Sequence, residues 1–184
     1  MEAGSSDPAD LGYHVTVRIE CVDLSVVRLP LVRAFETSFG RLAAREFVLV
    51  AVRDGGAVGW GECVADVDPF YSAETTTTAW HVLTKYLVPA VIGREFAHPR
   101  DLAGAWPPVR GHRMAKAALE MAGWDLYARR EGRPLCEVLG AMARPIAAGV
   151  SIGIQPSVGA LIDRVEAELA DGYRRIKIKI KPGW

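Results

Sequence analysis

The chain has 184 residues, and its 22 Lys and Arg are balanced by 22 Asp and Glu, so that its formal net charge is zero. Half of the residues are hydrophobic and 24% are charged, a composition that builds a core and excludes a disordered chain. The charge balance argues against a surface for nucleic acids or anionic membranes, and no apolar run approaches the roughly 20 residues that span a bilayer. We therefore expect neither a nucleic-acid nor a membrane partner.

The N-terminus and the cysteines bear on where the protein works. The opening residues MEAGSSDPAD are polar and acidic, without the basic and apolar regions of a secretory signal. Cys21, Cys63 and Cys136 lie far apart and form no CxxC pair, which favours reduced thiols over disulfides or a zinc site. These features predict a cytoplasmic protein, with residues 1–16 as a disordered N-terminal extension.

Strands come first along the chain. Residues 17–29 place apolar and charged side chains in near alternation, and residues 46–53 (EFVLVAVR) form a continuous apolar strand. A turn at Asp54-Gly55-Gly56 leads to a third strand over residues 57–62. Between the first two strands, residues 30–40 (PLVRAFETSFG) are interpreted as a loop. Because two phenylalanines in this loop must be buried somewhere, we expect it to cover something.

Helices follow. Ser72 is the expected N-cap of a helix that runs to about residue 87 and ends before Pro89, and a short helix is expected near residues 99–106. The strongest helical pattern covers residues 113–130 and ends at Gly132. Strands followed by helices predict an α+β domain over residues 17–144.

The pattern changes near Pro145. Residues 146–154 predict a short strand, residues 155–171 an amphipathic helix, and residues 174–181 (RRIKIKIK) another strand. A strand–helix–strand unit requires a parallel pair with a right-handed crossover. Two parallel strands have open edges and are no domain, so we expect residues 145–184 to be an incomplete piece of a larger architecture.

Lys177 and Lys179 are the most informative residues, because side chains two apart in a strand share a face. Two interpretations remain open. In one, the lysines are solvated on an edge strand and discourage pairing between sheets. In the other, the two close positive charges repel, so that one lysine is usable as a base near neutral pH.

Residues 175–184 (RIKIKIKPGW) resemble the o-succinylbenzoate synthase / N-acylamino acid racemase group of the enolase superfamily, in their Lys-x-Lys motif and the following Pro-Gly-Trp. Four further stretches agree in the same order and extend the resemblance over residues 17–184: residues 30–40, GWGECVADVDPFYS (59–72), GHRMAKAALEMAGWDL (111–126) and GVSIGI (149–154).

The resemblance implies an α+β capping domain over residues 17–144, followed by the first two strands of a TIM-like (β/α) barrel over residues 145–184. It implies an enzyme that abstracts a proton next to a carboxylate and stabilises the enediolate on Mg²⁺ or Mn²⁺. Two reactions are implied: a dehydration in menaquinone biosynthesis, which is a lyase reaction, and the racemisation of N-acylated amino acids, which is an isomerase reaction.

The resemblance also implies roles for particular residues. Lys179 is the base on one side of the α carbon, and Lys177 is the neighbour that tunes it. Ser151 lies on the first barrel strand at the floor of the active site. The loop residues Phe35, Phe39, Tyr71 and Asp66 close over a small-molecule carboxylate substrate, although the spacing of Asp66 and Asp68 by itself favours a solvated loop.

An eight-stranded barrel needs about 200 residues, far more than follow Arg144 in this sequence. The resemblance places three acidic metal ligands and a second catalytic lysine on later strands, so we assign no metal ligand here and expect this chain alone to bind no metal and to be inactive. The complete protein is expected to be a homo-oligomer. Alternatives are a catalytically dead fragment that acts at most as an association module, a dipeptide epimerase and a muconate-type cycloisomerase.

Overall fold

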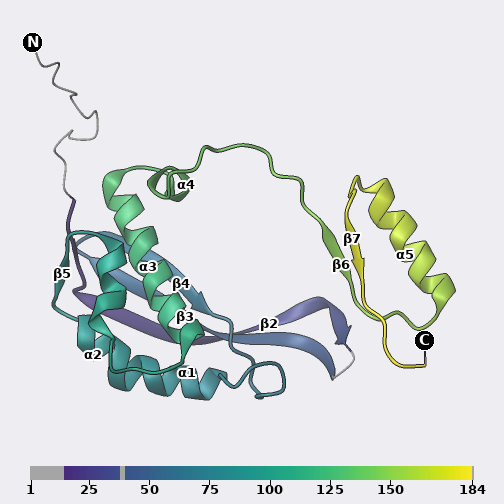
Figure 1. Ribbon diagram of the computed structural model, residues 1–184, viewed down its shortest axis with the longest axis horizontal. Helices are drawn as coiled ribbons and strands as arrows, with labels where there is room; N and C mark the ends of the chain where they lie inside the picture. Colours follow the sequence, from purple (N-terminus) through teal and green to yellow (C-terminus); the bar gives the residue numbers. More distant parts are fainter. Residues whose placement is uncertain (1–14, 38–39, 184) are drawn as a thin grey trace, which may run out of the picture.

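The computed structural model describes residues 15–37 and 40–183 (Figure 1). Phe39, and all of the predicted N-terminal extension before residue 15, lie outside the described residues. The larger sheet is an antiparallel meander of β2 (Cys21–Thr37), β3 (Gly40–Asp54) and β4 (Ala57–Cys63). A second antiparallel ladder joins β1 (Val17–Arg18) to β5 (Glu95–Phe96). The first predicted strand is therefore two strands, because the backbone of Ile19 bonds to residues 93 and 94 before β2 begins.

One face of the meander is apolar because side chains in a strand alternate between faces. The buried cross-strand pairs are Val48 with Cys63, Val50 with Gly61, and Val52 with Gly59. Helix α3 (Arg113–Glu131) lies on this face, and a Cβ at Gly61 would overlap the carbonyl oxygen of Ala118. Glycine in β4 therefore lets the helix backbone lie directly on the strand, which brings the start of α3 close to the end of β4.

The segment predicted as a loop over residues 30–40 is mostly strand, which corrects that interpretation. β2 continues to Thr37 and pairs with β3 as far as Thr37 opposite Gly40. The register shifts between Pro30 and Phe35, since proline has no N–H to donate to the ladder. The result is a long hairpin whose tip, residues 33–37 and 40–42, extends beyond the rest of the sheet.

The first helical segment begins later and ends later than predicted. Its N-cap is Thr75, which forms a capping box with Thr78, and not Ser72. The segment comprises α1 (Thr76–Val82), the π-helical turn η1 (Leu83–Leu87) and α2 (Val88–Val91), and so passes through Pro89. A π-turn widens the helix, and Pro89 stands at the first turn of α2, where its missing N–H costs little.

A 3-10 helix, η2 (Pro99–Ala105), leads towards α3, as predicted. The predicted helix over residues 113–130 is confirmed, and Gly132 ends it in the left-handed conformation. Helix α4 (Leu135–Val138) was not predicted.

The strand–helix–strand unit is confirmed, with shorter strands than predicted. β6 (Val150–Ile152) pairs in parallel with β7 (Ile176–Ile178), and α5 (Val158–Ala170) connects them. Over the described residues β7 pairs with β6 alone, from Val150 opposite Ile176 to Ile152 opposite Ile178. Ile178 is 48% exposed and Ile180 is 65% exposed, so both side chains are largely open to solvent.

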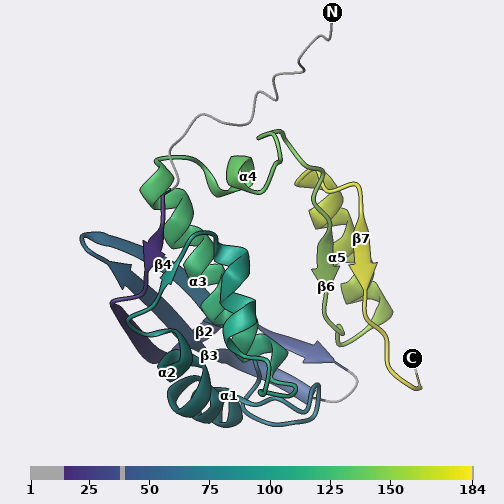
Figure 2. The ribbon, with the colours of Figure 1, turned by 60° about the vertical axis from the view of Figure 1, so that its left-hand side comes forward.

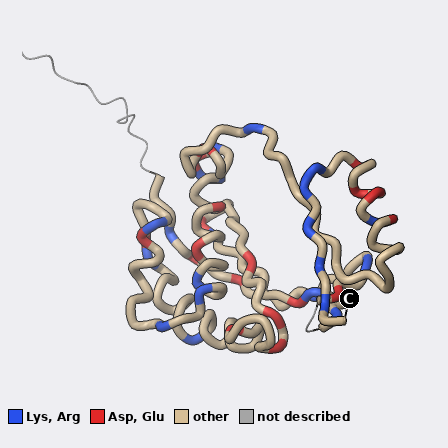
Figure 3. Tube along the Cα trace, turned by 45° about the vertical axis from the view of Figure 1, so that its right-hand side comes forward, with Lys and Arg blue, Asp and Glu red and all other residues tan. Residues whose placement is uncertain are grey.

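The hairpin tip reaches the β6–α5–β7 unit. In Figures 1 and 2 the end of β2 points at β6 and β7, while an extended segment after α4 joins the two parts of the chain. Figure 3 shows Lys and Arg following one another along β7 and the segment before it, whereas the acidic residues of this unit lie on α5. The tip therefore meets the side of this unit that carries the lysines of β7 and of the segment after it.

Candidate functional site

Lys179 follows the last residue of β7 and is fixed by the parallel ladder. Its backbone N–H donates to the carbonyl oxygen of Ile152 at 3.1 Å. Its side chain crosses to the hairpin tip, where Nζ lies 4.1 Å from the centre of the Phe35 ring. An ammonium over an aromatic face is attracted by the ring quadrupole, so this contact holds the two parts of the chain together at the site.

A cavity of about 290 Å³ lies beside this contact, and we call it the Lys179 cavity. Four residues predicted to be functional line it: Phe35, Asp66, Tyr71 and Lys179. Phe35 comes from β2, Asp66 and Tyr71 from the loop after β4, and Lys179 from the end of β7. Segments that are far apart in the sequence therefore meet around one space of a size suited to a small molecule.

Asp66 is already engaged inside this cavity. Its Oδ1 forms an ion pair with Arg45 at 3.1 Å, and Arg45 also lines the cavity. The cavity wall thus carries two positive side chains and one negative side chain. An anionic ligand is favoured there over a cationic one, since like charge repels.

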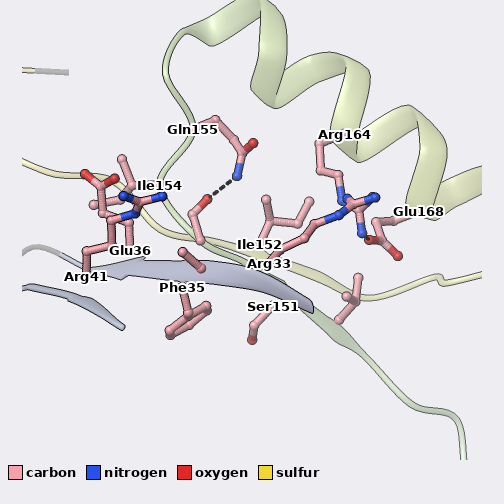
Figure 4. A pocket seen from close by; sticks show the side chains of 13 residues that line it. Arg33, Phe35, Glu36, Arg41, Ser151, Ile152, Ile154, Gln155, Arg164 and Glu168 are labelled. Atoms are coloured by element: carbon pink, nitrogen blue, oxygen red, sulfur yellow. Dashed lines mark hydrogen bonds and ion pairs between the residues drawn. The ribbon is translucent and has the colours of Figure 1, made fainter. Parts of the chain in front are cut away.

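The parallel ladder brings Lys177 and Ser151 together, and among the described residues neither lines the Lys179 cavity. Ser151 stands opposite Lys177 in the parallel register, and both are exposed. Ser151 lines a second cavity of about 360 Å³, shared with the hairpin tip and α5. In Figure 4 the side chains of Phe35 and Ser151 lie on one side of the β2 ribbon, while Gln155 and Arg164 lie on the other. Over the described residues, Lys177 lines neither cavity.

We tested whether the site fits a divalent metal ion. Among residues 15–37 and 40–183, no group of three or more His, Cys, Asp or Glu is placed to hold one. The acidic side chain of the Lys179 cavity, Asp66, already pairs with Arg45. The described residues therefore do not fit a divalent metal ion.

A family model for the N-terminal domain of mandelate racemase / muconate lactonizing enzyme matches residues 16–140. The chain belongs to this family. Among its relatives, the o-succinylbenzoate synthase of Geobacillus kaustophilus is 49% identical over 171 residues, which are 92% of this chain and 46% of the relative. The N-succinylamino acid racemase of Thermus thermophilus is 46% identical over 168 residues, which are 91% of this chain and 46% of the relative.

Solved structures of the superfamily agree. A member of the enolase superfamily from Enterococcus faecalis V583 superposes with a TM-score of 0.81 at 37% identity, over 92% of this chain and 46% of that chain. The resemblance to the o-succinylbenzoate synthase / N-acylamino acid racemase group and the capping-domain fold are thereby confirmed. The chain spans about half the length of the curated relatives that it matches.

The sequence did not single out every residue of the site. Arg45 was not among the predicted site residues, because its approach to Asp66 depends on the register of the long hairpin. Glu36 and Lys181 were also missed, and they form an ion pair of 3.1 Å between the hairpin tip and the segment after β7. Glu36 and Lys181 have opposite charges and lie in two of the stretches that carry the family resemblance, which is the sequence signal that could have indicated this pair. Over the described part of the chain, none of the helices has the length and apolar character needed to cross a membrane.

Proposed function

We propose that this chain supplies the capping domain and the base-bearing lysine of an o-succinylbenzoate synthase / N-succinylamino acid racemase. The reaction is removal of a proton next to a carboxylate, followed by dehydration or by return of a proton on the other face. Relatives with both names are similarly close to this chain, at 49% and 46% identity, and this similarity supports the proposal without separating the two activities.

The observation that carries the proposal is the position of Lys179. Its side chain lies where the hairpin tip, the loop after β4 and β7 converge on one cavity. An aromatic side chain at this point excludes water, and a drier site strengthens the interaction between the lysine and an anionic substrate. We assign Lys179 as the base, Lys177 as its neighbour, and Phe35, Tyr71 and Asp66 as contacts of the substrate. Ser151 and Phe39 keep their predicted roles as substrate contacts.

We further propose that the complete protein uses Mg²⁺ or Mn²⁺. Its acidic ligands would come from the part of the protein that corresponds to the half of the relatives not covered by this chain. On this proposal the 184-residue chain has no activity by itself. We propose a homo-oligomer for the complete protein, which its mass in solution would test.

The experiment uses the full-length protein with two substrates. N-succinyl-L-phenylalanine in D₂O reports racemisation through deuterium incorporation at the α carbon, and the hydroxylated precursor of o-succinylbenzoate reports dehydration through formation of the aromatic product. Turnover of either substrate supports the proposal and names the activity. Absence of both activities in protein supplied with Mg²⁺ would reject it.

A further inference from the structure

Glu36 joins the hairpin tip to the β6–α5–β7 unit through both its backbone and its side chain. Its carbonyl oxygen accepts a hydrogen bond from the N–H of Ile154 at 3.2 Å. Its Oε1 forms an ion pair with Nζ of Lys181 at 3.1 Å, and the two side chains are 38% and 44% exposed. We call these two interactions the Glu36 contacts.

The backbone hydrogen bond depends on a close approach at Gly153. A Cβ at this position would lie 3.3 Å from the carbonyl oxygen of Glu36 and 3.4 Å from its nitrogen. The ring of Phe35 would be 3.4 Å away, at Cδ2. The first distance is tighter than ordinary van der Waals contact and the other two are at its limit, so glycine at position 153 eases the close approach of the end of β2 to the chain that leaves β6.

The ion pair also has a local competitor. Arg41 stands opposite Glu36 in the β2–β3 register, where a cross-strand pair within the hairpin is the nearest geometric option. The carboxylate instead pairs with Lys181, which belongs to the other part of the chain. The side chain thus adds to the backbone bond in joining the two parts.

The Glu36 contacts lie next to Phe35 in the chain. Phe35 precedes Glu36, lines the Lys179 cavity, and places its ring 4.1 Å from Nζ of Lys179. We propose that Glu36 is a positioning residue, which through Lys181 and Ile154 holds Phe35 as a wall of the substrate site beside Lys179. This inference rests on the proposed function, since the site is the one assigned there to the substrate.

The first test needs no activity. Arg33 and Arg41 are exposed on the hairpin tip, so an arginine-specific protease reports how often the tip opens. In the full-length protein, we expect Glu36→Gln and Lys181→Met each to raise cleavage after these arginines by about two- to fivefold, the range set by an exposed ion pair. Glu166→Gln, the same change at an exposed glutamate on α5, is expected to leave cleavage unchanged.

The second test is kinetic. If Glu36 positions a wall of the site, Glu36→Gln raises KM for N-succinyl-L-phenylalanine by about two- to fivefold. The kcat of this variant stays within about twofold of the wild-type value. The exchanged pair Glu36→Lys with Lys181→Glu restores the wild-type KM. The protein's thermal midpoint is measured alongside, because a general loss of stability would not be restored by exchanging the charges.

The outcomes separate the two proposals. Unchanged cleavage and KM in Glu36→Gln, or failure of the exchanged pair to restore KM, would overturn the role of Glu36. A wild-type protein without activity would reject the proposed function, and the cleavage experiment would then decide by itself whether the Glu36 contacts hold the tip.

Discussion

Nζ of Lys179 lies 4.1 Å from the centre of the Phe35 ring, and this contact joins the end of β7 to the tip of the β2–β3 hairpin. Each of these residues reaches the Lys179 cavity because of one feature of the fold. Phe35 depends on a hairpin that continues past its register shift, and Lys179 depends on the parallel ladder with β6. The residue proposed as the base and the residue proposed as a wall of its site are therefore brought together by two separate parts of the chain.

Replacing Phe35 by alanine should change which substrates are accepted. The ring is a wall of the Lys179 cavity, so its removal leaves room for larger N-acyl groups and less contact with small ones. We expect the ratio of kcat/KM between a bulky and a small N-acyl substrate to shift by about tenfold. The control is Tyr86→Ala, an exposed aromatic on η1. An unchanged preference in Phe35→Ala would argue against this position of the tip.

Replacing Gly61 by alanine should destabilise the capping domain severely. The added Cβ would overlap the carbonyl oxygen of Ala118, so that α3 must move off the sheet. Overpacking of this kind costs typically about 1–3 kcal/mol, and a clash with helix backbone lies at or above the upper end of that range. Urea unfolding measures the loss. Gly56→Ala is the matched control, because its Cβ meets nothing within 4 Å; equal stabilities of the two variants would contradict this packing.

The start of α3 offers a second test of stability. The carboxylate of Glu74 accepts hydrogen bonds from the N–H groups of Met114 and Ala115, at 3.0 and 2.7 Å, and so caps a helix distant in sequence. We expect Glu74→Gln to lower the free energy of unfolding by about 1–2 kcal/mol, since the amide loses the charge that favours a helix N-terminus. Chemical denaturation checks this, and a variant as stable as the wild type would show that the cap contributes little.

The stability of the chain should fall at alkaline pH through Cys63. Burial raises the pKa of the Cys63 thiol, and the negative charge of Glu74 acts in the same direction. The folded state therefore keeps its proton where the unfolded chain loses it. This contribution is complete below the pKa of an unfolded cysteine, about 8.5, and is lost as pH rises through the raised value.

The measurement is the free energy of unfolding from about pH 7 to about pH 10 in the wild type and in Cys63→Ala. The wild type should lose more stability over this range than the variant, because only the wild type has a buried thiol at this position. Parallel curves would mean that Cys63 titrates alike in the folded and unfolded chain.

Much of the fold follows from local sequence. The apolar strand over residues 46–53, the Gly55-Gly56 turn and the helix that ends at Gly132 are determined by nearby residues, and the structure confirms them. The extension of the hairpin was missed because strand pairing through residues 30–37 depends on a partner strand, while Pro30 and the polar tip favour a loop. The passage of a helix through Pro89 was missed for a related reason. A π-turn before the proline removes the conflict, and the sequence carries no simple signal for it.

The sequence predicted several residues that line the candidate site, but it did not predict how they are arranged. Phe35, Asp66, Tyr71 and Lys179 were identified, and they line one cavity. Three charged residues of the site were not predicted, because each forms an ion pair with a residue far away in the sequence. Arg45 pairs with Asp66, and Glu36 pairs with Lys181. Ser151 stands opposite Lys177 in the parallel ladder, and over the described residues neither lines the Lys179 cavity, so their predicted roles stay predictions.

The central claim is that Lys179 removes the α-proton, and exchange of that proton with solvent measures it directly. In the full-length protein with N-succinyl-L-phenylalanine in D₂O, Lys179→Ala should abolish deuterium incorporation from one enantiomer at least, since the base of that face is gone. Lys85→Ala, at an exposed lysine on η1, should exchange like the wild type. Exchange at the wild-type rate from both enantiomers in Lys179→Ala would contradict the account and remove Lys179 from the reaction.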